Sequence, residues 1–595
     1  MKAKLVYCLI CLWCLALLQA CGNSSDQAEL SATARSFNID IVSSQINGLF
    51  SVNGQTYDAA QTSSAFYELV SSSSILDSVD LGYFFDQTYA VNVINGQYSL
   101  NYYDQFGPQT PLNYSEQITE VNVQADSVVN IDLERIEITP VFTLNGSGFP
   151  QSALERAAFY LQSENSDEQI FLGYSNAINN PVGIIPGSYS VFYKYESGSQ
   201  IPVNEHAMLL DSVKLDQDQT LDIDVKAISL TALFRINGEE FPLSAYEYAI
   251  IALTDSRQQD RVELGASYGG LIPGVPIIPG SYQVVYQHRE GTLLPQNPLF
   301  VFDKQYDLSN ANSRIEIDIP SITLDGNFMV NGNPAPVSAY DYARINLRQT
   351  GTETEFTIGN TFEQSYSGMV VIPAHYDVLY QRREYLDILP ANPNGTIASD
   401  LNLATTQQLD VDIRTVHVSA ALTLDGAEFP LDAYNYAHIL IKNHSQADEI
   451  KLSDTLNQGT PVTLIAGHYQ LIYQVYERQP DSPIPANRHF VFLDDQLILA
   501  DRIIQHDITT REIRLDPTLN GQDFPNSAYA YGRLYLASDE HESIPAMDTF
   551  QTMAPLRVID GSYQVYYEIR QGPDSVPANS YAWVGEINTN STSNY

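Results

Sequence analysis

A pair of tyrosines four residues apart recurs six times along this 595-residue chain. The clearest copy, PGSYQVVY, spans residues 279–286. The six pairs are Tyr98/Tyr102, Tyr189/Tyr193, Tyr282/Tyr286, Tyr376/Tyr380, Tyr469/Tyr473 and Tyr563/Tyr567. Successive pairs are separated by 91, 93, 94, 93 and 94 residues. A period this steady predicts six copies of one structural unit, a firmer basis for counting domains than chain length alone.

Each predicted unit opens with alternating apolar and acidic or polar residues, as in Asp222-Ile223-Asp224-Val225. Alternation with a period of two is typical of a strand with one buried face. The acidic residue in the third position is Asp40, Asp132, Asp224, Asp318, Asp412 or Asp507. This strand precedes all six units and does not follow the last one, so counting assigns it to the unit that follows it.

Two further signals recur at fixed places in every unit. Fourteen residues after the strand's Asp there is a glycine preceded by Asn or Asp, which predicts a tight hairpin with positive φ angles. These glycines are Gly54, Gly146, Gly238, Gly332, Gly426 and Gly521. A Pro-x-Asn sequence ends 15 to 18 residues after the first tyrosine of each pair, at Asn113, Asn204, Asn297, Asn392, Asn487 and Asn579.

Many short strands with regular turn signals and no convincing amphipathic helix predict an all-β chain of six tandem β-sandwich domains. The expected divisions are a signal peptide at 1–20, a flexible tether at 21–36 and repeats at 37–128, 129–220, 221–314, 315–408, 409–503 and 504–595. Linkers are very short, so neighbouring units are expected to touch. Laid end to end, six such units would form a rod of roughly 200 Å. A bent or compact arrangement is the alternative, because no sequence rule fixes the angles between units.

The unit resembles the transthyretin-like domains found beside carboxypeptidases and in tandem in bacterial surface proteins. The resemblance depends on the apolar-Gly-x-Tyr-x-apolar strand and the earlier Asn-Gly turn, and it covers about residues 37 to 587. Ala374 replaces the glycine in the fourth unit. The resemblance implies a transthyretin-like sandwich, and an immunoglobulin-like sandwich fits the same strand pattern.

The N-terminus has the features of an export signal. A basic start is followed by an apolar run from Leu5 to Leu18, which is too short to span a bilayer as a helix. The run ends in LQACG, which resembles the lipobox of bacterial lipoproteins and implies cleavage before Cys21 and acylation of that cysteine, for example with palmitate. In Gram-negative members of that class, Gly22 implies release to the outer membrane. An ordinary secretory signal is the alternative.

The other three cysteines, Cys8, Cys11 and Cys14, would leave with the signal peptide, so no disulfide is expected. The formal net charge of −42 disfavours binding to nucleic acids and anionic lipids. Most of the acids are expected to form a solvated surface. Because they recur where units meet, as in the cluster Asp216, Asp218, Asp222 and Asp224, calcium binding at the junctions is an alternative, although this cluster lacks the glycine and terminal Glu of an EF-hand loop.

No catalytic constellation is expected. Residues 265–269, GASYG, match a hydrolase nucleophile elbow, but no helix follows and Gly265 falls on a turn position of the repeat. His375 and His468 only replace the serine of Gly-Ser-Tyr and predict surface turn residues rather than zinc ligands.

The paired tyrosines are expected to lie in the core with their hydroxyl groups bonded at its rim. The sequence therefore predicts a lipid-anchored, non-enzymatic spacer, adhesin or interaction scaffold of the cell envelope, facing the periplasm or the exterior, with no cofactor. Its expected partners are the membrane, through Cys21, and a surface protein or polysaccharide. The alternative is a module that binds carbohydrate or peptidoglycan through exposed tyrosines such as Tyr246.

Overall fold

A computed structural model describes residues 34–56, 64–107, 110–310, 313–338, 340–383, 388–444, 448–539 and 541–590. Cys21 and the rest of the predicted signal and lipobox lie outside these ranges. Within them the chain is all-β, with fifty strands and three single-turn 3-10 helices, Phe84–Asp86, Ser267–Gly269 and Thr361–Glu363. No helix in the described ranges has the length and apolar character needed to cross a bilayer.

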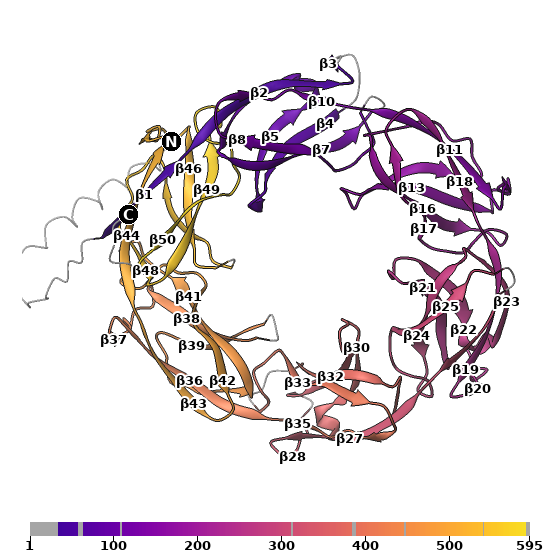
Figure 1. The fold of residues 1–595 in the computed structure, drawn as a ribbon. Coiled ribbons are helices and arrows are strands. Elements are labelled where there is room, and N and C mark those ends of the chain that lie inside the picture. Colours follow the sequence, from indigo (N-terminus) through magenta and orange to yellow (C-terminus); the bar gives the residue numbers. More distant parts are fainter. Residues whose placement is uncertain are drawn as a thin grey trace, which may run out of the picture.

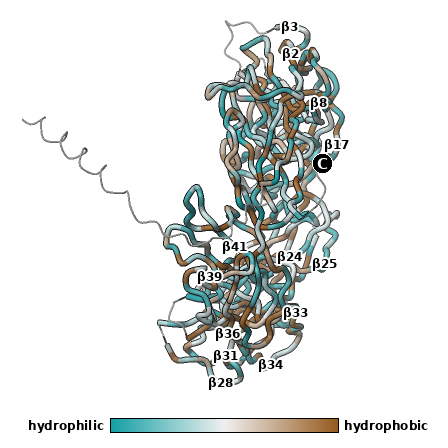
Figure 2. Tube along the Cα trace, turned by 90° about the vertical axis from the view of Figure 1, so that its left-hand side faces the viewer, coloured by the Kyte–Doolittle hydropathy of each residue, from teal (hydrophilic) through white to brown (hydrophobic). Residues whose placement is uncertain are grey.

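The six units follow one another around a closed ring, and the first unit lies beside the last (Figure 1). Seen from the side, the ring is a narrow slab (Figure 2). The straight rod is therefore wrong, and the units follow the bent arrangement that was the alternative. The reason lies in lateral contacts between units, which the strand pattern does not reveal.

Each unit is a sandwich of two sheets, and the third unit is a clear example. The outer sheet is built on β19 (Ile228–Ile236), which pairs with β20 (Glu239–Glu240), β23 (Leu271–Ile277) and, in parallel, β26 (Ser313–Ile319). The inner sheet has the order β22 (Arg261–Ala266), β21 (Tyr248–Asp255), β24 (Gly280–Glu290) and β25 (Phe300–Leu308). Apolar side chains from both sheets fill the space between them. The predicted all-β tandem sandwich is confirmed.

The same plan recurs in the other five units. The outer sheets are β2 (Ser43–Val52) with β3 (Gln55–Thr56), β6 (Thr88–Ile94), β9 (Ser127–Val128) and β10 (Ile131–Leu133); β11 (Ile136–Leu144) with β12 (Ser147–Gly148), β15 (Val182–Ile184) and β18 (Gln219–Val225); β27 (Ile322–Val330) with β28 (Asn333–Pro334), β31 (Ser365–Val371), β34 (Gln407–Gln408) and β35 (Val411–Ile413); β36 (Thr415–Leu424) with β37 (Ala427–Glu428), β40 (Val462–Ile465) and β43 (Arg502–Ile508); and β44 (Thr510–Leu519) with β45 (Gln522–Asp523), β48 (Leu556–Ile559) and β1 (Arg35–Ile41). The inner sheets are β5 (Ser74–Tyr83), β4 (Ser64–Ser71), β7 (Gly96–Phe106) and β8 (Glu116–Val123); β14 (Gln169–Tyr174), β13 (Arg156–Ser163), β16 (Gly187–Ser197) and β17 (Ala207–Leu215); β30 (Glu355–Asn360), β29 (Ala343–Gln349), β32 (Ala374–Arg382) and β33 (Asn394–Leu403); β39 (Glu449–Asp454), β38 (Tyr436–Asn443), β41 (Gly467–Glu477) and β42 (Phe490–Ile498); and β47 (Ile544–Asp548), β46 (Tyr531–Ala537), β49 (Ser562–Gln571) and β50 (Ala582–Asn588).

The acidic opening strand completes the outer sheet of the preceding unit. For example, β18 pairs in parallel with β11 of the second unit, and the chain then runs directly into β19 of the third. Its apolar residues enter the preceding core, since Ile223 and Val225 are buried there. Counting places this strand with the following unit, but its hydrogen bonds and its buried face belong to the preceding one.

The ring closes by the same rule. The sixth unit has no successor in the sequence, and β1, from the N-terminal end of the described chain, takes the vacant place beside β44. Seven residue pairs, from Arg35 opposite Ile513 to Ile41 opposite Leu519, keep the two strands in parallel register. Closing the ring in this way gives every outer sheet of the described chain its acidic strand.

Candidate functional site: the joints and the exposed loops

Each joint, meaning the contact between two neighbouring units, centres on the Asn of a Pro-x-Asn sequence. Asn204 of the second unit is fully buried in the third, where its side-chain amide donates to the Tyr282 hydroxyl at 3.0 Å. Its side-chain oxygen accepts from the N–H of Ile278 at 2.8 Å, and the N–H of Val203 donates to the Pro276 carbonyl at 3.0 Å. Asn204 thus supplies the acceptor for the Ile278 N–H and a donor to the Tyr282 hydroxyl in the next unit.

This joint is repeated six times around the ring. The Asn and Tyr partners are Asn113 and Tyr189, Asn204 and Tyr282, Asn297 and Tyr376, Asn392 and Tyr469, Asn487 and Tyr563, and Asn579 and Tyr98. The last pair joins the sixth unit to the first. The Pro-x-Asn sequence therefore carries the contact between units.

The two tyrosines of each pair have different roles. The Tyr282 hydroxyl accepts from Asn204 and donates to the Ile278 carbonyl at 2.7 Å, so it completes the joint on the incoming side. The Tyr286 hydroxyl donates to the Pro295 carbonyl at 2.8 Å and so holds the loop that carries the next Asn. Both rings are buried in the core, which confirms the prediction made for them.

A second contact at every joint involves the opening strand. The carboxylate of Asp224 accepts from the N–H of Gly146 at 2.8 Å and from the Thr143 hydroxyl at 2.9 Å, both in the preceding unit. Hydrogen bonds from Lys226, Gly146 and Thr143 lower the Asp224 pKa to about 2. The equivalent pairs are Gly54 and Asp132, Gly146 and Asp224, Gly238 and Asp318, Gly332 and Asp412, Gly426 and Asp507, and Gly521 and Asp40.

The glycine in this contact belongs to the predicted hairpin. Asn237 and Gly238 have φ angles of 50° and 80°, and all six turns share this left-handed geometry, which confirms the Asn-Gly signal. The Asp side chain of each opening strand thus accepts a hydrogen bond from the backbone of this turn. In the described part of the chain, no group of three or more His, Cys, Asp or Glu side chains could hold a metal.

Four joints bury a carboxylic acid beside the Asn amide, and in one of them the amide of Asn113 donates to Glu116 at 2.9 Å. Asp77 receives the amide of Asn579, and Asp260 receives that of Asn204. Burial raises the pKa of each of these two aspartates to about 6, although the hydrogen bonds act in the opposite direction. Burial also raises the pKa of Glu542, which accepts from the amide of Asn487. The joints at Asp77 and Asp260 are therefore expected to respond to mildly acidic pH.

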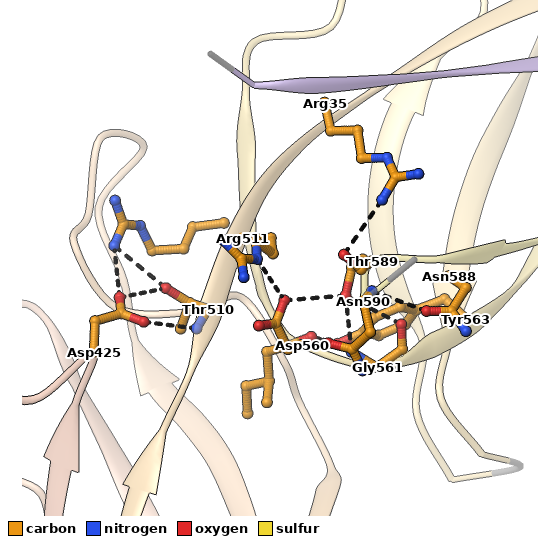
Figure 3. A network of polar contacts seen from close by, with 12 residues as sticks. Arg35, Asp425, Thr510, Arg511, Asp560, Gly561, Tyr563, Asn588, Thr589 and Asn590 are labelled. Carbon is orange, nitrogen blue, oxygen red and sulfur yellow. Dashed lines mark hydrogen bonds and ion pairs between the residues drawn. The ribbon is translucent and has the colours of Figure 1, made fainter. Parts of the chain in front are cut away.

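The closing joint contains further contacts between the two ends of the described chain (Figure 3). The Arg35 guanidinium donates to the Thr589 carbonyl at 3.5 Å. The Thr589 hydroxyl donates to Asp560 at 3.3 Å, and Asp560 also pairs with Arg511 at 3.1 Å. This network links β1 to the last strands of the sixth unit.

Five units present an exposed loop with apolar side chains, at residues 150–155, 242–247, 336–338 with 340–341, 430–435 and 525–530. The exposed apolar side chains are Leu154, Leu243, Tyr246, Val337, Tyr340, Leu431, Tyr434 and Tyr529. Tyr246 is 77% exposed and Tyr529 is 84% exposed, as expected for Tyr246. The loops occupy the same place in the strand order of each unit, between the short hairpin strand of the outer sheet and the next strand of the inner sheet.

These loops are anchored by hydrogen bonds. In the third unit the N–H of Tyr246 donates to the Ser244 hydroxyl at 3.1 Å, and the Glu247 carboxylate accepts from the N–H groups of Thr292 and Leu293. Similar turns recur at Leu154, Tyr340, Tyr434 and Tyr529. The loops thus offer an exposed apolar side chain in a fixed geometry.

The residues that matched catalytic patterns have structural roles. Ser267 of the GASYG sequence is fully buried, and its hydroxyl accepts from the N–H of Ala249 at 3.1 Å. Ser175, Thr361, Thr455 and Thr549 make the same bond in other units. His375 and His468 lie at the surface, as expected, where they pair with Asp400 and Asp495.

No protein-family model and no curated protein sequence matches this chain. Solved structures with a similar local arrangement include the Bacillus anthracis TIE protein (8% identity, TM-score 0.14, 60% of this chain and 69% of that chain). Two B repeat units of the Staphylococcus aureus collagen binding protein (9%, 0.12, 63% and 99%) and the minor pilin GBS52 of Streptococcus agalactiae (14%, 0.17, 31% and 95%) are also similar. At these TM-scores no common overall fold is established, so a function for this chain must rest on its own contacts.

Proposed function

We propose that this chain is a lipid-anchored protein of the cell envelope that acts, without catalysis, as a multivalent adhesin or interaction scaffold. The observation that supports this role is the set of anchored, exposed apolar loops repeated at equivalent places in five units of a closed ring. Each loop offers only a small contact area, but several loops can engage a surface together. Avidity of this kind exceeds the affinity of a single contact by orders of magnitude, roughly 100- to 10,000-fold.

The proposed anchor is Cys21, which lies outside the described residues. Acylation there with two or three chains would hold the protein firmly, whereas one chain binds only marginally. Incorporation of labelled palmitate into the wild-type chain and its loss in Cys21→Ala would support the anchor. Palmitate incorporation that is unchanged in Cys21→Ala would contradict it.

Orientation in the envelope decides what the loops can meet. We propose the outer membrane of a Gram-negative bacterium as the location, with the loops facing either the exterior or the periplasm. Protease treatment of intact cells distinguishes the two. Removal of the acylated protein from whole cells indicates the exterior, and protection until the outer envelope is opened indicates the periplasm.

The loops themselves are tested by replacing four tyrosines, Tyr246, Tyr340, Tyr434 and Tyr529, with alanine in one chain. Because these side chains are exposed, the melting temperature should stay within a few degrees of wild type, while attachment of protein-coated beads to cell surfaces should fall at least tenfold. Tyr114→Ala, at an exposed tyrosine outside the loops, is the control and should leave attachment unchanged. Equal attachment by all three proteins would refute the role of the loops.

The exposed tyrosines also favour a second candidate, a module that binds carbohydrate or peptidoglycan. Tyrosine rings at a fixed spacing can stack on sugar rings. Binding of the wild-type chain to a glycan array, lost in the fourfold variant, would establish this second function. A fourfold variant that loses attachment to cells without any glycan binding by wild type would favour a protein partner.

A further inference from the structure

The closing joint differs from the other five in its covalent connection. Between the second and third units, β18 ends at Val225 and β19 begins at Ile228, so the strand that completes one unit leads directly into the next. The strand that completes the sixth unit, β1, instead leads into the first unit, at the other end of the sequence. Of the six joints, this is the one that noncovalent contacts alone keep closed.

The sixth unit nevertheless binds β1 through the same contacts that the other units make with their acidic strands. Asp40 accepts from the Gly521 N–H and the Thr518 hydroxyl, each at 2.8 Å. The N–H of Asn520 donates to the Ile41 carbonyl, and Ile39 and Ile41 are buried in the core of the sixth unit. The binding site for β1 therefore recognises the strand by its sequence and does not require a covalent link.

The sixth unit in turn contributes a residue, Asn579, that binds in the first unit. Asn579 of the sixth unit donates to Tyr98 and Asp77 of the first and accepts from the Ile94 N–H. If the joint opens, one end of the chain offers β1 and the site for Asn579, and the other end offers Asn579 and the site for β1. A second copy of the chain carries both complements, so each hydrogen bond and apolar packing interaction that opening breaks can form again between two copies.

We propose that β1 is an exchangeable strand, and that the binding site on the sixth unit accepts either the β1 of its own chain, giving a closed ring, or the β1 of a second copy. The exchanged contact is head-to-tail. It leaves an unfilled β1 site at one end of the assembly and a free β1 at the other until the assembly closes, so it produces dimers and larger closed or open assemblies. This inference rests on the closure of the ring and is independent of the function proposed above.

The test compares two substitutions that remove the same side chain at different joints. Asn579→Ala weakens the closing joint, and Asn487→Ala weakens the joint between the fifth and sixth units, where Tyr563 and Glu542 provide the equivalent contacts. Both are made in a Cys21→Ala background, which excludes association through an acyl chain. Light scattering coupled to size-exclusion chromatography measures the mass at increasing protein concentration.

Because the same contacts re-form between two copies, Asn579→Ala mainly makes the joint open faster. We expect its weight-average mass at high concentration to rise at least twofold faster than that of wild type, while Asn487→Ala stays monomeric over the same time because its joint is backed by the covalent chain. Equal masses for the two variants at every concentration would overturn the proposal.

A disulfide between β1 and β44, called the lock below, distinguishes strand exchange from nonspecific association. Asn38 and Asp516 are exposed register partners on β1 and β44, so cysteines at both positions can be oxidised to close the joint. Added to Asn579→Ala, the oxidised lock should abolish the oligomers and the reduced form should restore them. Oligomers that persist in the oxidised protein would refute exchange through β1.

A third measurement does not depend on oligomers. In Ile41→Asp the ring's own β1 binds poorly, because a charge enters the core of the sixth unit. A labelled peptide of residues 35–43 should then bind this variant and not wild type. Failure of the peptide to bind a variant that remains folded by circular dichroism would also overturn the proposal.

Discussion

The side-chain amide of Asn579 donates to the hydroxyl of Tyr98 at 3.0 Å, although 481 residues separate the two in the sequence. At the other five joints the same pair of side chains is separated by only 76 to 79 residues. The geometry of a joint is therefore independent of how far apart its partners lie along the chain. Substitutions in and around the joints can measure what holds the ring together.

Removing the hydroxyl of the first tyrosine of a pair should lower the free energy of unfolding most where that hydroxyl is the main acceptor for the Asn amide. Tyr376→Phe removes the acceptor for Asn297 and the donor to the Ile372 carbonyl, and should cost about 1 to 3 kcal/mol. Tyr282→Phe should cost less, because Asn204 keeps Asp260 as an acceptor. Urea unfolding of the two variants checks this order, and a larger loss for Tyr282→Phe would contradict it.

Mild acid should strengthen the joints that bury Asp77 and Asp260. Their folded-state pKa of about 6 lies above the unfolded value of about 3.9. Protonation therefore favours the folded state, so the stabilisation is complete below pH of about 4 and is lost as the pH rises through 6. The gain from pH 7.5 to pH 4.5 should be roughly 1 to 3 kcal/mol for each carboxyl.

The control for this pH effect is the double variant Asp77→Asn and Asp260→Asn. This control is needed because burial lowers the pKa of four histidines, His206, His288, His438 and His506. Protonation of these histidines destabilises the folded protein as the pH falls through their folded-state pKa values. The difference between the stability curves of wild type and variant isolates the two aspartates. A difference that does not change between pH 4.5 and 7.5 would show that they do not titrate there.

The turn glycines should be sensitive to substitution for reasons of backbone conformation alone. Gly238 has a φ of +80°, and a Cβ there would meet nothing within 4 Å. Gly238→Ala should therefore cost about 1 to 2 kcal/mol, the penalty of a left-handed residue. Gly148 is equally open and lacks a positive φ, so Gly148→Ala should leave the melting temperature unchanged or slightly raised.

In each exposed loop, the contribution of the anchoring carboxylate to the free energy of unfolding should increase with the burial of that carboxylate. Asp341 is fully buried, accepts from the N–H groups of Ile388 and Leu389 and lies 3.7 Å from the buried Arg382 guanidinium. Asp341→Ala should be about 2 to 3 kcal/mol more destabilising than Glu247→Ala, since the Glu247 carboxylate is partly solvated. Calorimetry of the two variants measures the difference, and equal losses would contradict it.

Much of the unit could be predicted from the sequence because local patterns report local structure. Alternation places Ile223 and Val225 on a buried face, Asn237-Gly238 predicts a tight turn, and the tyrosine pair predicts a core strand. These signals depend on which face of a strand is apolar and on which residues tolerate a positive φ.

The ring could not be predicted in the same way, because alternation does not say whose core a strand enters. The Pro-x-Asn pattern marks a recurring Asn without indicating its role. The available signal is its position, because a buried polar contact repeated in six units requires the same polar residue at the same place in each. The sixth unit also lacks a following acidic strand. That imbalance is the signal that the first acidic strand, containing Asp40, completes the last unit.

The parallel register of β1 with β44 also decides how the ring responds to mechanical load. The chain enters the ring at Arg35, so a pull applied to the N-terminal side reaches this pair of strands before any other part of the fold. A pull along the strand direction must slide seven paired residues past one another together and cannot separate them one at a time. The seam that lacks a covalent link is therefore oriented to resist shear.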